Sequence, residues 1–114
     1  MVRETIASVR ASALVDYRVV ISDNCSDEAA RQATSAYVAA LDDPRFAFVV
    51  QPENGGEYGQ GRFFFEQSEG AEYFVILHDD DLLDPDYLQM AIERLAAAPA
   101  AALFIANPRL IDEG

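Results

Sequence analysis

Apolar positions recur along the chain in two patterns, and each pattern predicts a different kind of element. Residues spaced three or four apart, such as Val2, Ile6 and Val9, indicate an amphipathic helix. Short runs of consecutive apolar residues, such as FAFVV at 46–50, indicate strands that are buried on both faces. Because the two patterns alternate along the chain, the sequence predicts an α/β fold.

The predicted elements follow one another with short connections. We expect helices over residues 2–12, 26–41, 62–68 and 84–99. We expect strands over residues 17–22, 46–50, 73–77 and 101–106, and a glycine-rich loop over 51–61. Ser26 is the expected N-cap of the second helix, because a hydroxyl there accepts hydrogen bonds from first-turn amides. Continuous apolar strands separated by helices predict a mostly parallel sheet layered by helices.

The composition fits one folded domain, and the net charge disfavours two classes of binding partner. The chain has 114 residues, of which 51% are hydrophobic, enough for one compact core. Its net charge is −12, from 20 acidic residues and 8 basic ones, all of them arginine. Such an acidic surface repels nucleic-acid phosphates and anionic lipid headgroups, so we expect neither as a partner. We expect no transmembrane segment in this chain, because no apolar run approaches the ~20 residues that a membrane helix needs.

Cysteine usage indicates the compartment. Cys25 is the only cysteine, which excludes an internal disulfide and a thiolate metal cluster. We expect it to be a small, half-buried residue, as free cysteines commonly are. No signal peptide is visible in MVRETIASVR. We therefore expect a soluble protein of a reducing compartment, located in the cytoplasm, or at the membrane periphery in a longer form.

Polar residues cluster where the predicted strands end. The four groups are Asp23-Asn24, Asn54-Gly55-Gly56, His78 to Asp81, and Asn107. In open α/β sheets, ligands bind at the carboxyl ends of the strands. We therefore expect all four groups to lie along one edge of the sheet and to form a binding site.

Three consecutive aspartates stand out in FVILHDDDLLDPDY, residues 74–87. At an effective dielectric of ~20, two carboxylates ~6 Å apart repel by roughly 3 kcal/mol, so a bound cation would stabilise them. On an extended backbone, His78 and Asp80 face one side, and Asp79 and Asp81 face the other. We expect one or two of these carboxylates to bind a hard cation such as Mg²⁺ or Mn²⁺, with water and phosphate oxygens as the other ligands.

Simpler interpretations of these groups stay open on the sequence alone. The aspartates also fit a solvated cluster at the start of the helix near Pro85. A calcium EF-hand loop is disfavoured, because its sixth position would be Asp84, where glycine is required. Asp23-Asn24 also fits an Asx-turn, and the three residues from Asn54 fit a plain turn.

Three segments, in order, resemble the inverting family 2 glycosyltransferases of the GT-A fold. They are VVISDNCSDEAARQ (19–32), NGG (54–56) and EYFVILHDDDLLDPDYL (72–88). Members of that family typically carry a strand that ends in Asp-(Gly or Asn)-x-Ser-x-Asp. An Asn-x-Gly loop follows, and then an acidic motif of the D-x-D type with a proline a few residues later. The resemblance covers nearly the whole chain.

The resemblance implies roles for residues of the first two segments. Asp23 matches the acidic residue that contacts the nucleotide base. Asn54 and Gly55 match the loop that lines the nucleotide-sugar pocket. Arg62 lies near a position where relatives often carry arginine or asparagine, and the resemblance suggests that it faces the diphosphate.

The third segment covers the motif that, in the family, binds the ribose and the metal-diphosphate. Aligned by Pro85, Asp80 takes the metal-binding position, and the other register uses Asp79 and Asp81. We assign Asp79 to nucleotide-sugar binding, and Asp80 and Asp81 to the metal, with Asp80 preferred as the ligand.

The implied reaction transfers a sugar, with inversion, from a nucleotide-diphospho-sugar to a hydroxyl of a saccharide, a lipid or another acceptor. A metal on the diphosphate stabilises the leaving group, and a general base deprotonates the acceptor. In the family this base lies beyond residue 114, so we assign no catalytic residue. Residues 1–114 are expected to be a single, partial donor-binding domain that lacks the family's central first strand.

Two functions of other classes remain as alternatives. One is a non-catalytic nucleotide- or metal-binding α/β module. The other is a phosphotransfer domain, which is weakened because the chain has no lysine to serve as the usual cationic partner of such a site.

Overall fold

The computed structural model describes residues 1–111, and its first five elements alternate between helix and strand as predicted. The helices are α1 (Val2–Arg10), α2 (Glu28–Ala40), α3 (Gly56–Gln67) and α4 (Tyr87–Ala97). The strands are β1 (Val19–Asp23) and β2 (Phe46–Val50). The two strands pair in parallel, from Val19 opposite Phe46 to Asp23 opposite Val50. The prediction of an α/β fold with a parallel sheet is therefore confirmed.

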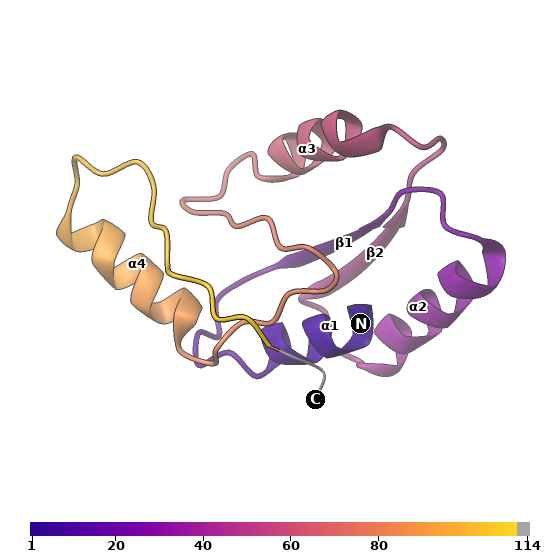
Figure 1. Cartoon of the computed structure of the whole chain (residues 1–114), viewed down its shortest axis with the longest axis horizontal. Helices are drawn as coiled ribbons and strands as arrows, with labels where there is room; N and C mark the ends of the chain where they lie inside the picture. The colour runs from indigo at the N-terminus through magenta and orange to yellow at the C-terminus, as the bar shows by residue number, and fades with distance from the viewer. Residues whose placement is uncertain (112–114) are drawn as a thin grey trace.

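Helices cover the two-stranded sheet from two sides. Figure 1 shows α1 and α2 along one side of β1 and β2, and α3 on the opposite side. The buried core lies on the side of α1 and α2. Its members are Ile6, Val9, Val38, Leu41 and Phe46, contributed by α1, α2 with the residue after it, and β2. The apolar spacing predicted for the first two helices thus identifies the faces that pack.

The start of α2 differs from the prediction by one residue. Asp27, not Ser26, is the N-cap, and its carboxylate accepts a hydrogen bond of 2.9 Å from the amide of Ala30. Ser26 is held in the preceding turn, where its own amide donates to Asp23 Oδ2 at 3.2 Å. The turn after β1 thus delays the helix, and a carboxylate takes the capping role.

Two of the four predicted strands do not form. Residues 73–77 and 101–106 are irregular, and within residues 1–111 neither segment pairs with a neighbouring strand. A strand needs such a neighbour to satisfy its backbone N–H and C=O groups. In the first segment, only Leu77 packs against the core, whereas Phe74 and Val75 are exposed. The prediction that these segments are strands buried on both faces is therefore wrong.

None of the helices within the described range has the length and apolar character needed to cross a bilayer.

Asp43 and Arg45 form a bidentate ion pair in the turn between α2 and β2. Arg45 Nη2 lies 2.7 Å from Asp43 Oδ2, and Arg45 Nε donates to Asp43 Oδ1 at 3.0 Å. The Arg45 guanidinium also lies 4.5 Å from the centre of the Tyr17 ring. The hydrogen bonds from Arg45 lower the pKa of the Asp43 carboxyl from 3.8 to about 2. The pair fixes the turn through which the chain enters β2.

This ion pair predicts a pH-dependent loss of stability in Asp43→Asn. Because the folded-state pKa of Asp43 is depressed, its stabilisation is fully present above pH 3.8 and is lost as the pH falls through about 2. The urea midpoint of Asp43→Asn should therefore be lower than that of the wild type at pH 7, and the gap should close towards pH 2. Asp16→Asn, an exposed substitution in the segment before β1, should show no such gap, because Asp16 forms no ion pair among the described residues. A gap that is constant from pH 7 to pH 2 would contradict this role.

Candidate functional site

Asp23 is placed at the carboxyl end of β1 and is largely buried, with 9% of its surface exposed. Its Oδ2 accepts the 3.2 Å hydrogen bond from Ser26, and its carbonyl oxygen accepts one of 2.9 Å from the amide of Gln51. The second bond joins the end of β1 to the residue that follows β2. Asp23 is thus fixed both in the turn to α2 and against the neighbouring loop.

Two hydrogen bonds join the loops after β1 and β2, and a third lies within the second loop. Asn24 Nδ2 donates to Asn54 Oδ1 at 3.1 Å, and the amide of Gly55 donates to Asn24 Oδ1 at 3.0 Å. The amide of Gly56 donates to Asn54 Oδ1, also at 3.0 Å. The structure thus brings together two of the four predicted groups, Asp23-Asn24 and the loop from Asn54. The sequence placed Asn24 in one of the four expected groups but indicated no individual task for its side chain.

A second polar layer lies beneath these loops and anchors α3. Ser22 Oγ donates to Gln60 Oε1 at 2.8 Å and accepts a hydrogen bond of 2.9 Å from Gln51 Nε2. Ser22 lies in β1 and Gln60 in α3, so this network ties the helix to the strand ends. Gln60 Nε2 is buried without a protein partner within the described residues.

The acidic run is held against α1 rather than at the end of a strand. Thr5 Oγ1 donates to the carbonyl oxygen of Asp79 at 2.9 Å, and Ser8 Oγ accepts a bond of 3.1 Å from the amide of Leu83. The backbone turns between these anchors, with the amide of Asp81 3.3 Å from the carbonyl oxygen of His78. The prediction of an extended backbone with alternating sides is therefore wrong here.

The side chains from His78 to Asp81 are exposed. Within residues 1–111, no hydrogen bond links them to Asp23 or Asn54. Asn107 is also exposed, in a segment that forms no strand. The prediction that all four groups follow strands along one sheet edge is therefore wrong for these two groups, because residues 73–77 and 101–106 have no strand neighbour.

The donor chemistry of the acidic run fits a hard cation that keeps most of its ligands outside the protein. Among the described residues, no three His, Cys, Asp or Glu side chains gather where they could hold a metal ion. Mg²⁺ commonly takes only one or two carboxylates and completes its coordination with water and phosphate. The exposed carboxylates of Asp80 and Asp81 provide that number. They are suited to a metal that arrives with a diphosphate.

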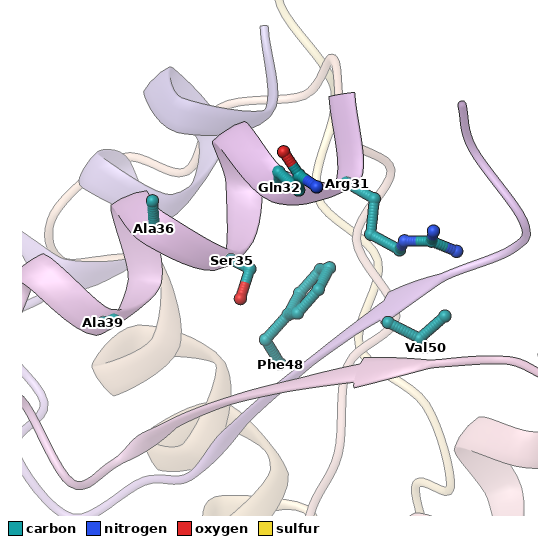
Figure 2. Close-up of a pocket in the computed structure, with 7 residues that line it drawn as sticks. All are labelled: Arg31, Gln32, Ser35, Ala36, Ala39, Phe48 and Val50. Carbon is teal, nitrogen blue, oxygen red and sulfur yellow. The ribbon is translucent and has the colours of Figure 1, made fainter. Parts of the chain in front are cut away.

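Two surface hollows lie away from the acidic run. One has a volume of about 400 Å³. Figure 2 shows Phe48 and Val50 of β2 projecting towards α2 at this hollow. A second, of about 480 Å³, lies along α3 and is lined by Glu57, Tyr58, Gly61, Arg62 and Phe65. Arg62 is 81% exposed there and pairs with Glu66 at 2.9 Å, one helical turn away. The expected contact between Arg62 and the diphosphate stays a prediction.

Cys25 differs from its predicted environment. It is exposed and adopts a positive φ of 64°, and its Sγ lies 3.4 Å from the carbonyl oxygen of Gln51. The left-handed turn between β1 and α2 places the side chain outside the core. The prediction of a half-buried cysteine is therefore wrong.

Comparisons with known proteins point to one family. The sequence model of glycosyl transferase family 2 matches residues 1–113. The uncharacterized protein y4gI of Sinorhizobium fredii is 33% identical over 112 residues, which is 97% of this chain. The succinoglycan biosynthesis protein ExoO of Rhizobium meliloti is 36% identical over 95 residues, which is 83% of this chain. No solved structure is significantly similar to the chain.

The relatives are much longer than this chain. The matched region spans 12% of the length of y4gI and 26% of the length of ExoO.

Proposed function

The chain belongs to glycosyl transferase family 2, and on that premise we propose that residues 1–114 are a single, partial donor-binding domain for a nucleotide-diphospho-sugar. The observation that carries the proposal is the hydrogen-bonded junction between the loops after β1 and β2, centred on Asn24 and Asn54. The junction lies at the carboxyl ends of the two parallel strands, the end at which open α/β sheets bind ligands. The acidic run, on a separate anchor, would supply the charged part of the site.

In this proposal each predicted residue has one task. Asp23 would accept hydrogen bonds from the N–H groups of the nucleotide base. Its partial burial and its bond to Ser26 fix the orientation of the carboxylate. Asn54 and Gly55 would line the pocket for the sugar and the diphosphate, and Asp79 would accept hydrogen bonds from the ribose.

Members of the family generally use a divalent metal, and Asp80 and Asp81 are the residues that would hold Mg²⁺ or Mn²⁺ here. When bound, such a cation stabilises the negative charge that the diphosphate gains as it leaves. The anchors from Thr5 and Ser8 would hold the acidic turn in place for this role. Asp80 is the preferred ligand, since its position relative to Pro85 matches the family's motif.

The proposed reaction is sugar transfer, with inversion, to an acceptor hydroxyl in the cytoplasm. The name of ExoO refers to succinoglycan biosynthesis, so a saccharide acceptor is favoured over a lipid or another hydroxyl compound. A base that deprotonates this hydroxyl is not among the residues assigned here.

Calorimetric titration tests the proposal. Nucleoside diphosphates should bind saturably, and Mn²⁺ should tighten at least one of them about tenfold or more, which is about 1.4 kcal/mol. Absence of binding by any nucleoside diphosphate, with and without Mn²⁺, would contradict the proposal. Binding without transfer or hydrolysis of any nucleotide-sugar would favour the non-catalytic module.

Asp23→Asn should weaken nucleoside-diphosphate binding about 10- to 100-fold. Hydrogen bonds to charged groups contribute about 1.5–3 kcal/mol, and the substitution replaces a charged acceptor with a neutral amide. Calorimetry measures the change, and Asp16→Asn is the matched control, because it makes the same substitution before the start of β1, whereas Asp23 lies at its carboxyl end. Equal affinity in wild type and Asp23→Asn would exclude Asp23 from the base contact.

A further inference from the structure

We infer that Asn24 is a positioning residue that holds Asn54 with its N–H groups, and not its oxygen, turned to the ligand. This inference rests on the proposed function, because it names the chemistry that the loop after β2 offers to the donor. It is carried by two hydrogen bonds between the loops, through Asn24, and by a third within the loop after β2, from the Gly56 amide to Asn54.

The orientation of both side-chain amides follows from the backbone. A backbone N–H can only donate, so the atom that it faces must be an oxygen. The amide of Gly55 faces Oδ1 of Asn24, and the amide of Gly56 faces Oδ1 of Asn54. The bond between the two side chains must therefore run from Asn24 Nδ2 to Asn54 Oδ1. Turning either amide over would set two donors against each other.

These bonds use the acceptor capacity of Asn54. Its Oδ1 accepts from Asn24 and from Gly56, which occupies both lone pairs of an amide oxygen. Its Nδ2 has no acceptor within residues 1–111, and the side chain is exposed. The polar group that Asn54 presents is therefore a donor. Its partner would be an oxygen acceptor of the nucleotide-sugar, on the diphosphate or on a sugar hydroxyl.

The same bonds remove competing donors from the loop. The amides of Gly55 and Gly56, at the start of α3, are already used by the two asparagines. Gly56 also adopts a φ of 60°, a conformation that residues other than glycine rarely adopt. Asn54 Nδ2 is thus the donor that this loop offers to a ligand, and the hydrogen bond from Asn24 fixes its position.

Two substitutions of Asn24 separate its two bonds. Asn24→Ala removes both bonds. Asn24→Asp keeps the acceptor for the amide of Gly55 but replaces the donor with a second oxygen, which repels Asn54 Oδ1. Gln32→Ala is the control, because it deletes an exposed amide that pairs only within α2, with Glu28.

Amide-proton exchange measured by NMR tests the positioning without any ligand. In Asn24→Ala, the Gly55 amide should exchange about five- to tenfold faster than in the wild type, as expected for loss of one hydrogen bond. In Asn24→Asp it should stay protected. Gln32→Ala should leave Gly55 unchanged. Unchanged exchange of Gly55 in Asn24→Ala would overturn the inference.

Titration with nucleoside diphosphates in the presence of Mn²⁺ tests the consequence for binding. Both Asn24 variants should raise the Kd about tenfold, and Gln32→Ala should not. Asn54→Asp, which keeps an oxygen for Gly56 but replaces the donor, should weaken binding at least as much. If the variants bind as well as the wild type, Asn24 does not position the donor site. If the wild type binds no nucleoside diphosphate, the proposed function and its ligand assignment fail together, while the exchange data still decide the junction.

Discussion

Phe46→Ala should lower the free energy of unfolding by about 3–5 kcal/mol, the usual cost of removing a buried phenylalanine. Phe46 opens β2 and is 7% exposed. Its ring packs edge-on to Tyr17 at 6.2 Å between centroids, with the Arg45 guanidinium 5.9 Å away. The core has five buried apolar residues within the described range, so each one matters to the whole domain. Urea denaturation followed by circular dichroism measures the change.

The matched control is Tyr58→Ala, which also deletes an aromatic ring. Tyr58 is 97% exposed on α3, and such surface substitutions usually change stability by less than about 0.5 kcal/mol. Similar unfolding midpoints for Phe46→Ala and the wild type would show that the core does not lie between α1, α2 and β2.

Asp80→Asn should abolish the metal-dependent part of nucleoside-diphosphate binding and leave the fold intact. The substitution keeps the size of the side chain but removes the charge that a hard cation prefers. The Kd in Mn²⁺ should rise to the value measured in a chelator, a loss of about tenfold or more, which is about 1.4 kcal/mol. Because Asp80 is exposed and its turn is anchored by Thr5 and Ser8, the unfolding midpoint should not fall.

Companion variants distinguish the two registers of the acidic motif. Asp81→Asn should have a smaller effect than Asp80→Asn if Asp80 is the principal ligand. Asp16→Asn should have none, because it makes the same substitution at an exposed residue before β1 that has no assigned role in the site. If Asp80→Asn keeps its Mn²⁺ dependence while Asp79→Asn or Asp81→Asn loses it, the alternative register is correct.

The sequence predicted the elements in which the spacing of apolar residues is regular. Helices α1, α2 and α4, and strands β1 and β2, agree with the apolar spacing to within a few residues. Residues 73–77 have the composition of a strand but no strand beside them within the described residues. Composition reports whether a segment suits a sheet, whereas strand formation also requires a neighbour.

The start of α3 was predicted wrongly because of its glycines. The sequence predicted a loop through residue 61, but the helix begins at Gly56. Glycine is unfavourable within helices, so a segment with glycines at 56, 59 and 61 indicated a loop. In the fold, the side-chain oxygens of Asn24 and Asn54 accept hydrogen bonds from the amides of Gly55 and Gly56 at the start of this helix. The hydrogen bond between Ser22 and Gln60 anchors the middle of the helix.

One part of the candidate site was predictable from the sequence, and the other part was not. That the loops after β1 and β2 meet follows from the parallel pairing of two strands that the sequence identified. The attachment of the acidic run to α1 depends on bonds from Thr5 and Ser8 across more than 70 residues of sequence. Hydroxyls on a helix give no sign of a distant partner, so no sequence pattern indicated that placement.

The central claim is that the strand-end loops and the acidic run serve one nucleotide-sugar. Paramagnetic broadening of backbone amide signals by Mn²⁺, added with a nucleoside diphosphate, tests this most directly. We predict the strongest broadening at Asp80 and Asp81, and weaker broadening at Asp23 and Gly55 that disappears when the nucleotide is omitted. Broadening confined to the acidic run, with Asp23 and Gly55 unaffected by metal and nucleotide together, would contradict the claim.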